Sequence, residues 1–333
     1  MTTFFGSRCS ACLASPLEYC LKVIDDRESP AKETPILFCP RCGTGRTSVI
    51  SSEDEVRQNN QSLYDDETQY TNRVHSADHL KRCLDDATWI ARLIGLPTTR
   101  PLKQRHLDIG CSSGGMMAAF SKLGYESFGI EPSAAGREAP PALASRIEQC
   151  YFGDESLAGP VDLITAFHVL EHVSDPEAFL KRCHGRLNEQ GVLVIEVPSF
   201  EFARKRLNDD PVGLLNHISP YYHLHHFTRA GLDTMLRRTG FIPTWSGFVS
   251  PLFIRKLGTK ASQSSRGNSE PSPRLENQQK KRPSLITNAG QAVKKSAWRF
   301  RAVRMRVRHF LANNLALGQY IRVIARAVDS HEQ

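Results

Sequence analysis

Short apolar runs alternate with helical patterns in the middle of the chain, which predicts an α/β fold. Strands are expected at 127–131, 161–167 and 191–198, where at least four apolar or small residues follow one another, and at 105–109, just before a glycine-rich turn. A helical stripe between 76 and 96 has this apolar face: Leu80, Leu84, Ala87, Ala91 and Ile94. A second helix is expected from Pro176 to Leu187. Strands that alternate with helices in this way favour a mostly parallel sheet.

The same patterns divide the chain into segments. We expect a core over 106–256, preceded by a linker and helices at 51–105 that can serve as a substrate lid. Thr228 is a good N-cap for a helix that Gly240 ends. Residues 257–290 are rich in Ser, Gln, Asn and Pro, which predicts a disordered insertion. A basic amphipathic helix at 291–312 and an alternating strand within 313–333 complete the chain.

Charge is unevenly distributed over the 333 residues, whose formal net charge is +8. Residues 1–254 carry a net −5 and residues 255–333 a net +13, which argues against a core that binds polyanions. The basic helix has three interpretations: packing on the protein, docking on an anionic membrane surface, and nucleic-acid contact. The sequence has neither a secretory signal nor an apolar run of membrane-spanning length, so we expect a cytoplasmic protein that can be membrane-peripheral.

Four of the nine cysteines form two C-x-x-C pairs, which predicts a zinc site in an N-terminal ribbon over 1–50. The ligands are expected to be Cys9, Cys12, Cys39 and Cys42. Four thiolates leave no position for water, so the zinc ion would be structural. The alternative is a set of buried or redox-active cysteines. Residues 1–50 hold six basic and five acidic residues, and this balance favours a substrate-docking or bracing role over RNA binding.

A glycine-rich turn follows the first expected strand of the core. Asp108, Gly110 and Gly114 give the pattern D-x-G-x-x-x-G, and the next strand ends in Glu131, 23 residues after Asp108. Small residues let a ligand approach the backbone, and an acid at the end of the second strand can bind ribose hydroxyls. The sequence therefore predicts a nucleotide site in a βαβ unit.

The continuation V-L-E-H at 169–172 and H-L-x-x-F at 223–227 completes the pattern. From Leu107 to Phe248 the chain resembles the class I S-adenosylmethionine-dependent methyltransferases. The resemblance implies a Rossmann-like fold with a mostly parallel seven-stranded sheet whose last strand, here 318–328, is antiparallel. It also implies a cofactor site, in which Ser112 stands where the family often has glycine. The residues implied for it are Asp108, Gly110, Ser112, Gly114, Glu131, Asp154, Phe167 and His168.

Three neighbouring residues, His168, Glu171 and His172, have two interpretations. They brace the loop beside the cofactor, or they share a metal ion, since imidazole and carboxylate groups in neighbouring turns can do so. The sequence leaves both open.

The order of a four-cysteine segment, a tyrosine-bearing stretch and this core is similar to sugar C-methyltransferases that act on nucleotide-linked sugars. In those enzymes tyrosines after the zinc segment and a histidine before the final helix surround the substrate. The resemblance implies such roles for Tyr64 and Tyr70, and His223 and His226 are candidate bases. We expect O- or C-methylation of a small molecule or glycan, as in polysaccharide biosynthesis. The alternative is a zinc-ribbon protein that binds or methylates RNA.

Overall fold

The computed structural model describes residues 8–25, 32–48, 54–58, 77–95, 104–156, 159–206, 217–218, 222–249 and 318–328. The seven-stranded sheet has the order β10-β11-β8-β7-β4-β5-β6. Its strands are β4 (Arg105–Ile109), β5 (Glu126–Ile130), β6 (Ile147–Glu148), β7 (Val161–Phe167), β8 (Leu187–Pro198), β10 (Phe241–Val249) and β11 (Tyr320–Ala327). The segments 51–53, 59–76, 96–103, 250–317 and 329–333 lie outside the described residues, and with them the predicted insertion, the basic helix and the parts of the predicted 51–105 lid other than 54–58, 77–95 and 104–105.

The neighbours from β8 to β6 run parallel, and β11 lies antiparallel between β8 and β10. The predicted Rossmann-like methyltransferase fold with a mostly parallel seven-stranded sheet is therefore confirmed. From β4 the chain adds strands first on one side, with β5 and β6, and then on the other, with β7 and β8. This reversal makes the carboxyl ends of β4 and β7 a switch point, where α/β folds bind ligands.

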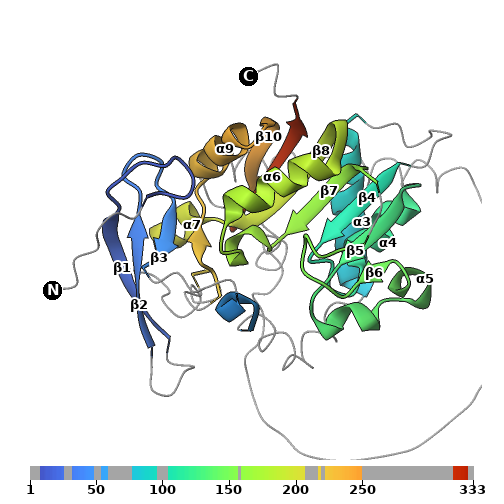
Figure 1. Cartoon of the computed structure of the whole chain (residues 1–333), viewed down its shortest axis with the longest axis horizontal. Coiled ribbons are helices and arrows are strands. Elements are labelled where there is room, and N and C mark those ends of the chain that lie inside the picture. Colours follow the sequence, from blue (N-terminus) through green and yellow to red (C-terminus); the bar gives the residue numbers. More distant parts are fainter. Residues whose placement is uncertain are drawn as a thin grey trace, which may run out of the picture.

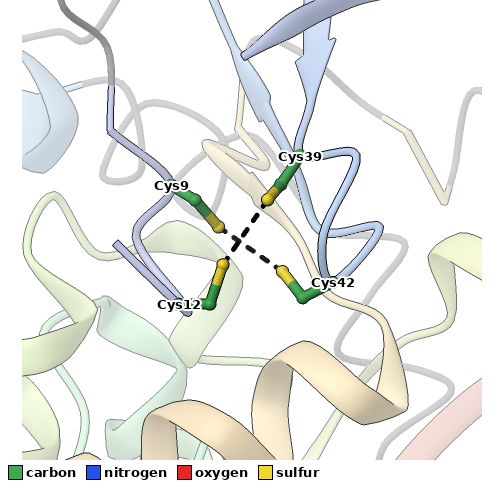
Figure 2. Close-up of side chains that lie close together, drawn as sticks. All are labelled: Cys9, Cys12, Cys39 and Cys42. Atoms are coloured by element: carbon green, nitrogen blue, oxygen red, sulfur yellow. Dashed lines mark hydrogen bonds between the residues drawn. The ribbon is translucent and has the colours of Figure 1, made fainter. Parts of the chain in front are cut away.

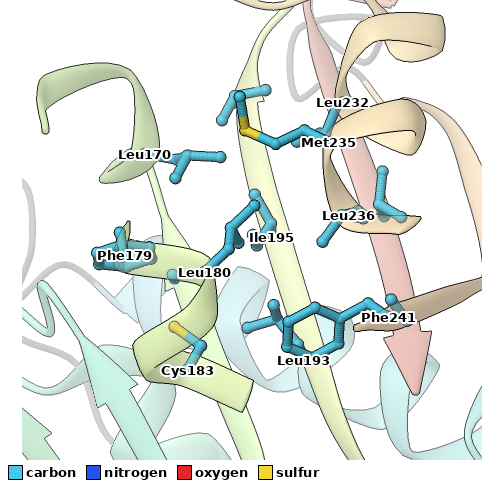
Figure 3. Close-up of a cluster of buried hydrophobic side chains, with 14 of the residues drawn as sticks. Leu170, Phe179, Leu180, Cys183, Leu193, Ile195, Leu232, Met235, Leu236 and Phe241 are labelled. Carbon is cyan, nitrogen blue, oxygen red and sulfur yellow. The ribbon is translucent and has the colours of Figure 1, made fainter. Parts of the chain in front are cut away.

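Helices cover both faces of this sheet (Figure 1). The helices are α3 (Ala77–Leu93), α4 (Gly115–Lys122), α5 (Pro141–Ala144), α6 (Pro176–Arg186), α7 (Phe200–Arg206) and α9 (Arg229–Arg238), with 3-10 turns η1 (Ala134–Glu138) and η2 (Leu170–His172). On one face α6 and α9 pack on alternate residues of β8, Leu193 and Ile195, as Figure 3 shows. On the other face α3 and α4 pack on Val192 and Val194. Burial on both faces explains the continuous apolar runs of the central strands.

A second, four-stranded sheet joins the N-terminal segment to the core. It has the order β1-β2-β3-β9, with β1 (Glu18–Asp25), β2 (Lys32–Phe38) and β3 (Gly45–Thr47) from the ribbon and β9 (His225–His226) from the segment before α9. The ribbon is thus not a detached module, because its sheet is completed by a strand from the other end of the core (Figure 1). None of the described helices has both the length and the apolar character needed to cross a membrane.

Candidate cofactor site and metal-binding clusters

The glycine-rich turn after β4 folds against the end of β5. The amides of Gly110 and Cys111 both donate to the carbonyl of Ile130, at 2.8 and 3.1 Å. Gly110 has a φ of 70°, and a Cβ there would lie 2.5 Å from Cγ2 of Val169. Gly114, with a φ of 81°, precedes the first turn of α4. Only glycine meets both the backbone angle and the close approach at position 110.

Ser112 has a φ of 49°, which explains why glycine is the usual residue at this position. Its amide donates to Oε2 of Glu131 at 2.8 Å, while Oε1 accepts from the amide and the hydroxyl of Ser133 at 2.9 and 2.7 Å. Glu131 is 7% exposed. Each oxygen of a carboxylate has two lone pairs, so Oε1 is fully used and Oε2 keeps one acceptor position for a further hydrogen bond.

Asp108 lies at the end of β4 in a buried hydrogen-bonded chain. Its Oδ1 accepts from the hydroxyl of Thr165 at 2.6 Å, and Thr165 accepts in turn from Nε2 of His106 at 2.9 Å. Burial lowers the pKa of His106 to about 3, so its imidazole is neutral. Burial raises the pKa of the Asp108 carboxyl to about 7, with a smaller contribution from Glu131. An incoming cation at this place would stabilise the ionised carboxylate.

Two of the predicted cofactor residues meet partners that the sequence did not indicate. Asp154 is exposed and pairs with Arg57 at 3.2 Å, and the Arg57 guanidinium lies 4.4 Å from the ring centre of Tyr151. Residues 54–58 are helical, and Arg57 brings this helix into contact with the region expected for the adenine. Phe167 packs under the guanidinium of Arg322, 4.9 Å from the ring centre.

His168 stands at the bend after β7, with a φ of 56°. Its Nδ1 lies 3.5 Å from Oε1 of Glu171 and its Nε2 lies 3.4 Å from Oε1 of Glu196. Only a protonated imidazole has an N–H for each of two carboxylates. Burial lowers the pKa of His168, but the two carboxylates raise it more, to about 10. Glu196 also pairs with Arg322 of β11, which reaches Asp86 of α3 at 3.0 Å.

The four predicted zinc ligands lie together, with every sulfur atom within 4.8 Å of the others. Figure 2 shows the sulfur atoms pointing at one another from two knuckles; the Cys9–Cys42 and Cys12–Cys39 pairs are each separated by 3.5 Å. Zn–S bonds of about 2.3 Å in a tetrahedron place sulfur atoms roughly 3.8 Å apart. The geometry is therefore compatible with one tetrahedral ion and too open for disulfides.

The two knuckles have the same backbone conformation. The amide of Leu13 donates to the carbonyl of Cys9 at 3.0 Å, and that of Gly43 to the carbonyl of Cys39 at 2.7 Å. Leu13 and Gly43 both have positive φ, 61° and 75°. Glycine adopts this conformation without strain in the second knuckle, whereas the first knuckle has a leucine there, Leu13, which is 45% exposed.

The histidines before α9 separate into two groups. His225 and His226 form β9, which pairs with β3 of the ribbon. His226 is 3% exposed and packs on Phe200, and burial lowers its pKa well below the ordinary value. A neutral, buried ring in a sheet is suited to packing and poorly suited to proton removal, so the base role predicted for His226 has no support in this position.

His223 points the other way, to η2. Its ring lies 4.8 Å from that of His172, and its Nδ1 donates to the carbonyl of His217 at 3.1 Å. Burial lowers the pKa of His223 to about 3, which weakens it as a base at neutral pH. Its position beside Glu171 and His172 is not evident from the sequence, because about fifty residues separate them. Tyr64 and Tyr70, the other predicted catalytic residues, lie outside the described residues.

Known proteins match the core. Residues 80–243 match a family model described as "Methyltransferase domain". A ubiquinone biosynthesis O-methyltransferase of Rhodopseudomonas palustris (strain TIE-1) is 32% identical over 97 residues, 27% of this chain and 38% of the relative, and one of Bradyrhizobium sp. (strain ORS 278) is 34% identical over the same shares. The matched stretch thus spans less than half the length of these curated relatives.

Solved structures that resemble this chain include further methyltransferases. The Burkholderia thailandensis 1,6-didemethyltoxoflavin-N1-methyltransferase with S-adenosylhomocysteine is 14% identical with a TM-score of 0.47, covering 89% of this chain and 96% of that one. The plantazolicin methyltransferase BpumL with SAH is 15% identical with a TM-score of 0.49, covering 83% and 97%. Sheet order, glycine-rich turn and family match agree that residues 80–243 are a methyltransferase domain, in a chain with the Rossmann-like fold of the class I S-adenosylmethionine-dependent methyltransferases.

Proposed function

We propose that this chain transfers the methyl group of S-adenosylmethionine to a small-molecule acceptor. The observation that carries the proposal is Glu131. Its carboxylate is fixed by Ser112 and Ser133 at the end of β5, beside the glycine-rich turn and the switch point of a methyltransferase domain. The remaining acceptor position on Oε2 suits one hydroxyl of a ribose, and a second hydroxyl would replace the Ser133 hydroxyl on Oε1.

The other cofactor contacts follow from the positions along the carboxyl edge of the sheet. Asp108 would pair with the ammonium group of the methionine part, and Gly110 and Gly114 would let the cofactor approach the backbone. Phe167 and His168, after β7, would line the methionine side. Asp154 would accept from the adenine amino group, for which its ion pair with Arg57 must rearrange or extend.

For the acceptor we propose a sugar, which can be linked to a nucleotide. The support is the order of segments that the sequence shares with sugar C-methyltransferases, together with the pairing of β3 with β9, which brings the four-cysteine segment to the stretch from His223 to His226. Tyr64 and Tyr70 would then face the acceptor, and one of these two tyrosines would take its proton.

A second candidate acceptor is a phenolic hydroxyl. The local similarity to ubiquinone biosynthesis O-methyltransferases favours it, over the 97 matched residues. Phenols lose their proton far more readily than sugar hydroxyls, so this reaction needs a weaker base.

We further propose that Cys9, Cys12, Cys39 and Cys42 hold a structural zinc ion. The support is the gathering of their four sulfur atoms within 4.8 Å of one another, at separations compatible with one tetrahedral ion, and four thiolates leave no position for water. In this role the ion would maintain the ribbon sheet and, through β9, the segment that carries His223.

Purified full-length protein with S-adenosylmethionine and a panel of acceptors tests the function. The panel contains nucleotide-linked deoxysugars, free sugars, catechols and RNA, and the assay measures S-adenosylhomocysteine release together with the mass of the product. Turnover with a nucleotide-linked sugar supports the sugar proposal, and turnover with a catechol alone supports the second candidate. Binding of S-adenosylhomocysteine with methylation of RNA alone would contradict both acceptors.

A further inference from the structure

A second cluster of metal-ligand side chains lies apart from the cysteines. Glu171, His172 and His223 each offer a ligand atom, and these atoms lie within 4.8 Å of one another. Glu171 and His172 belong to η2, just after the bend at His168, and His223 comes from the segment before α9. The amide of Leu224 donates to the carbonyl of Glu171 at 2.8 Å and holds the two segments together.

The carboxylate of Glu171 is poorly satisfied. The residue is 1% exposed, and neither of its oxygens has a hydrogen-bond partner among the described residues. His168 approaches one oxygen at 3.5 Å, which is an ion pair rather than a hydrogen bond, and it is shared with Glu196. A buried carboxylate with an oxygen that receives no hydrogen bond is costly, so a cation at this place would stabilise the fold.

Both histidines are fixed in the form that binds metal ions. Nδ1 of His172 lies 2.9 Å from the carbonyl of Tyr222, and Nδ1 of His223 lies 3.1 Å from the carbonyl of His217. A carbonyl oxygen only accepts, so each Nδ1 carries the proton, and each neutral ring keeps its lone pair on Nε2. A backbone carbonyl that orients the ring through Nδ1–H is the usual outer support of a histidine ligand.

We propose that Glu171, His172 and His223 form a binding site for a divalent transition-metal ion, separate from the four-cysteine cluster. Two imidazole nitrogens and one carboxylate suit zinc and similar ions and suit magnesium poorly, because magnesium prefers oxygen ligands and retained water. The site uses His223 where the sequence pattern indicated His168, since His168 is turned to Glu171 and Glu196 as an ion-pair partner. The proposal does not depend on the methyl-transfer function.

Metal binding by His223 would exclude this residue as the catalytic base. A nitrogen lone pair that binds a metal ion cannot accept a proton, so His223 would act as a ligand and not as the base. The N-terminal ribbon would help to position this metal site, because the amide of Thr47 donates to the carbonyl of Leu224, the residue after His223, at 3.0 Å.

Zinc stoichiometry of the full-length protein tests the proposal. After removal of metal and reconstitution with Zn²⁺ alone, wild type should hold about two ions per chain, and Glu171→Gln and His223→Asn about one each. The matched control is His184→Asn, a histidine of α6 whose Nε2 donates to the carbonyl of Val328 at 2.9 Å, and it should keep both ions. Reconstitution with Co²⁺ separates the sites, because only the cysteine cluster gives thiolate charge-transfer absorption.

Three results would overturn the proposal. Wild type that holds a single ion with full thiolate absorption has no second site, and this measurement needs no variant. Glu171→Gln and His223→Asn that keep both ions would place the second ion elsewhere. A Cys9→Ser, Cys12→Ser protein with native far-ultraviolet dichroism and no bound metal would lead to the same conclusion. If Glu171→Gln does not fold, the wild-type stoichiometry and cobalt spectrum decide.

Discussion

Replacement of Arg322 by methionine should destabilise the protein through the charge it leaves behind. Arg322 is 4% exposed and donates to Glu196 from β8, which is 7% exposed, and to Asp86 of α3. Methionine keeps much of the volume against Phe167 and Trp89, whose ring centres lie 4.9 and 5.5 Å from the guanidinium. The variant therefore isolates the loss of charge from the loss of packing.

Breaking a buried pair by removing one partner typically costs 3–5 kcal/mol. Glu196 keeps the imidazolium of His168 at 3.4 Å, and Asp86 is 44% exposed and well solvated. We therefore expect a loss near the lower end, about 3 kcal/mol in the free energy of unfolding at pH 7. The measurement is urea denaturation followed by far-ultraviolet dichroism, with wild type and variant at equal concentrations.

The double variant Arg322→Met, Glu196→Gln provides the comparison, because it also removes the buried charge. It should recover at least about 1 kcal/mol relative to the single variant. Burial alone raises the pKa of Glu196, but Arg322 and His168 hold it at about 2. This stabilisation is present above the unfolded pKa and is lost as pH falls toward 2, so the difference between wild type and Arg322→Met should shrink in acid. A single variant that loses less than about 1 kcal/mol, or a double variant no more stable than the single, would refute the reasoning.

Three further predictions concern the ribbon and the cofactor site. Thr228→Val should lose about 1–2 kcal/mol in the free energy of unfolding, because the Thr228 hydroxyl accepts from the amide of Gly231 and donates to the carbonyl of Cys42. The half-buried Thr234 of α9 donates only to the carbonyl of Ala230 in its own helix, so Thr234→Val should change stability little, and equal losses in urea would contradict this. Removal of the zinc ion proposed for the cysteine cluster should reduce hydrogen-exchange protection at Leu224 and β9, and unchanged protection would contradict the proposed support of β9 by the ion. Binding of S-adenosylhomocysteine should tighten roughly tenfold from pH 6 to pH 8, because burial raises the pKa of Asp108 to about 7 and only the ionised carboxylate pairs with the ligand ammonium group. Calorimetry measures this affinity, and a flat pH profile in wild type, or the same slope in Asp108→Asn, would contradict the proposed contact of Asp108 with the ligand.

Much of the core could be predicted from local patterns. The strands β4, β5, β7 and β11 coincide with short apolar or alternating runs, and Thr228 caps α9 as its side-chain chemistry indicates. The D-x-G-x-x-x-G pattern predicted the glycine-rich turn, and the φ of 70° at Gly110 explains why glycine is needed there.

The remainder depends on contacts between distant segments. The strand β9 has two residues, and it forms because β3 offers partners from the other end of the chain. The approach of His223 to Glu171 and the pairing of Arg322 with Glu196 also join residues far apart in sequence. A single sequence contains no periodicity that specifies such pairs, so the histidines near Thr228 could be identified but not assigned to opposite sides.

The central claim, that the edge of this sheet binds S-adenosylmethionine, is tested most directly by calorimetric titration of the full-length protein with S-adenosylhomocysteine. The account predicts one site per chain in wild type and at least roughly tenfold weaker binding in Glu131→Ala, which loses the hydrogen bonds to the ribose. Glu126→Gln, at the opposite end of the same strand, should bind as wild type does. Wild type that binds no S-adenosylhomocysteine, or Glu131→Ala with unchanged affinity, would contradict the account.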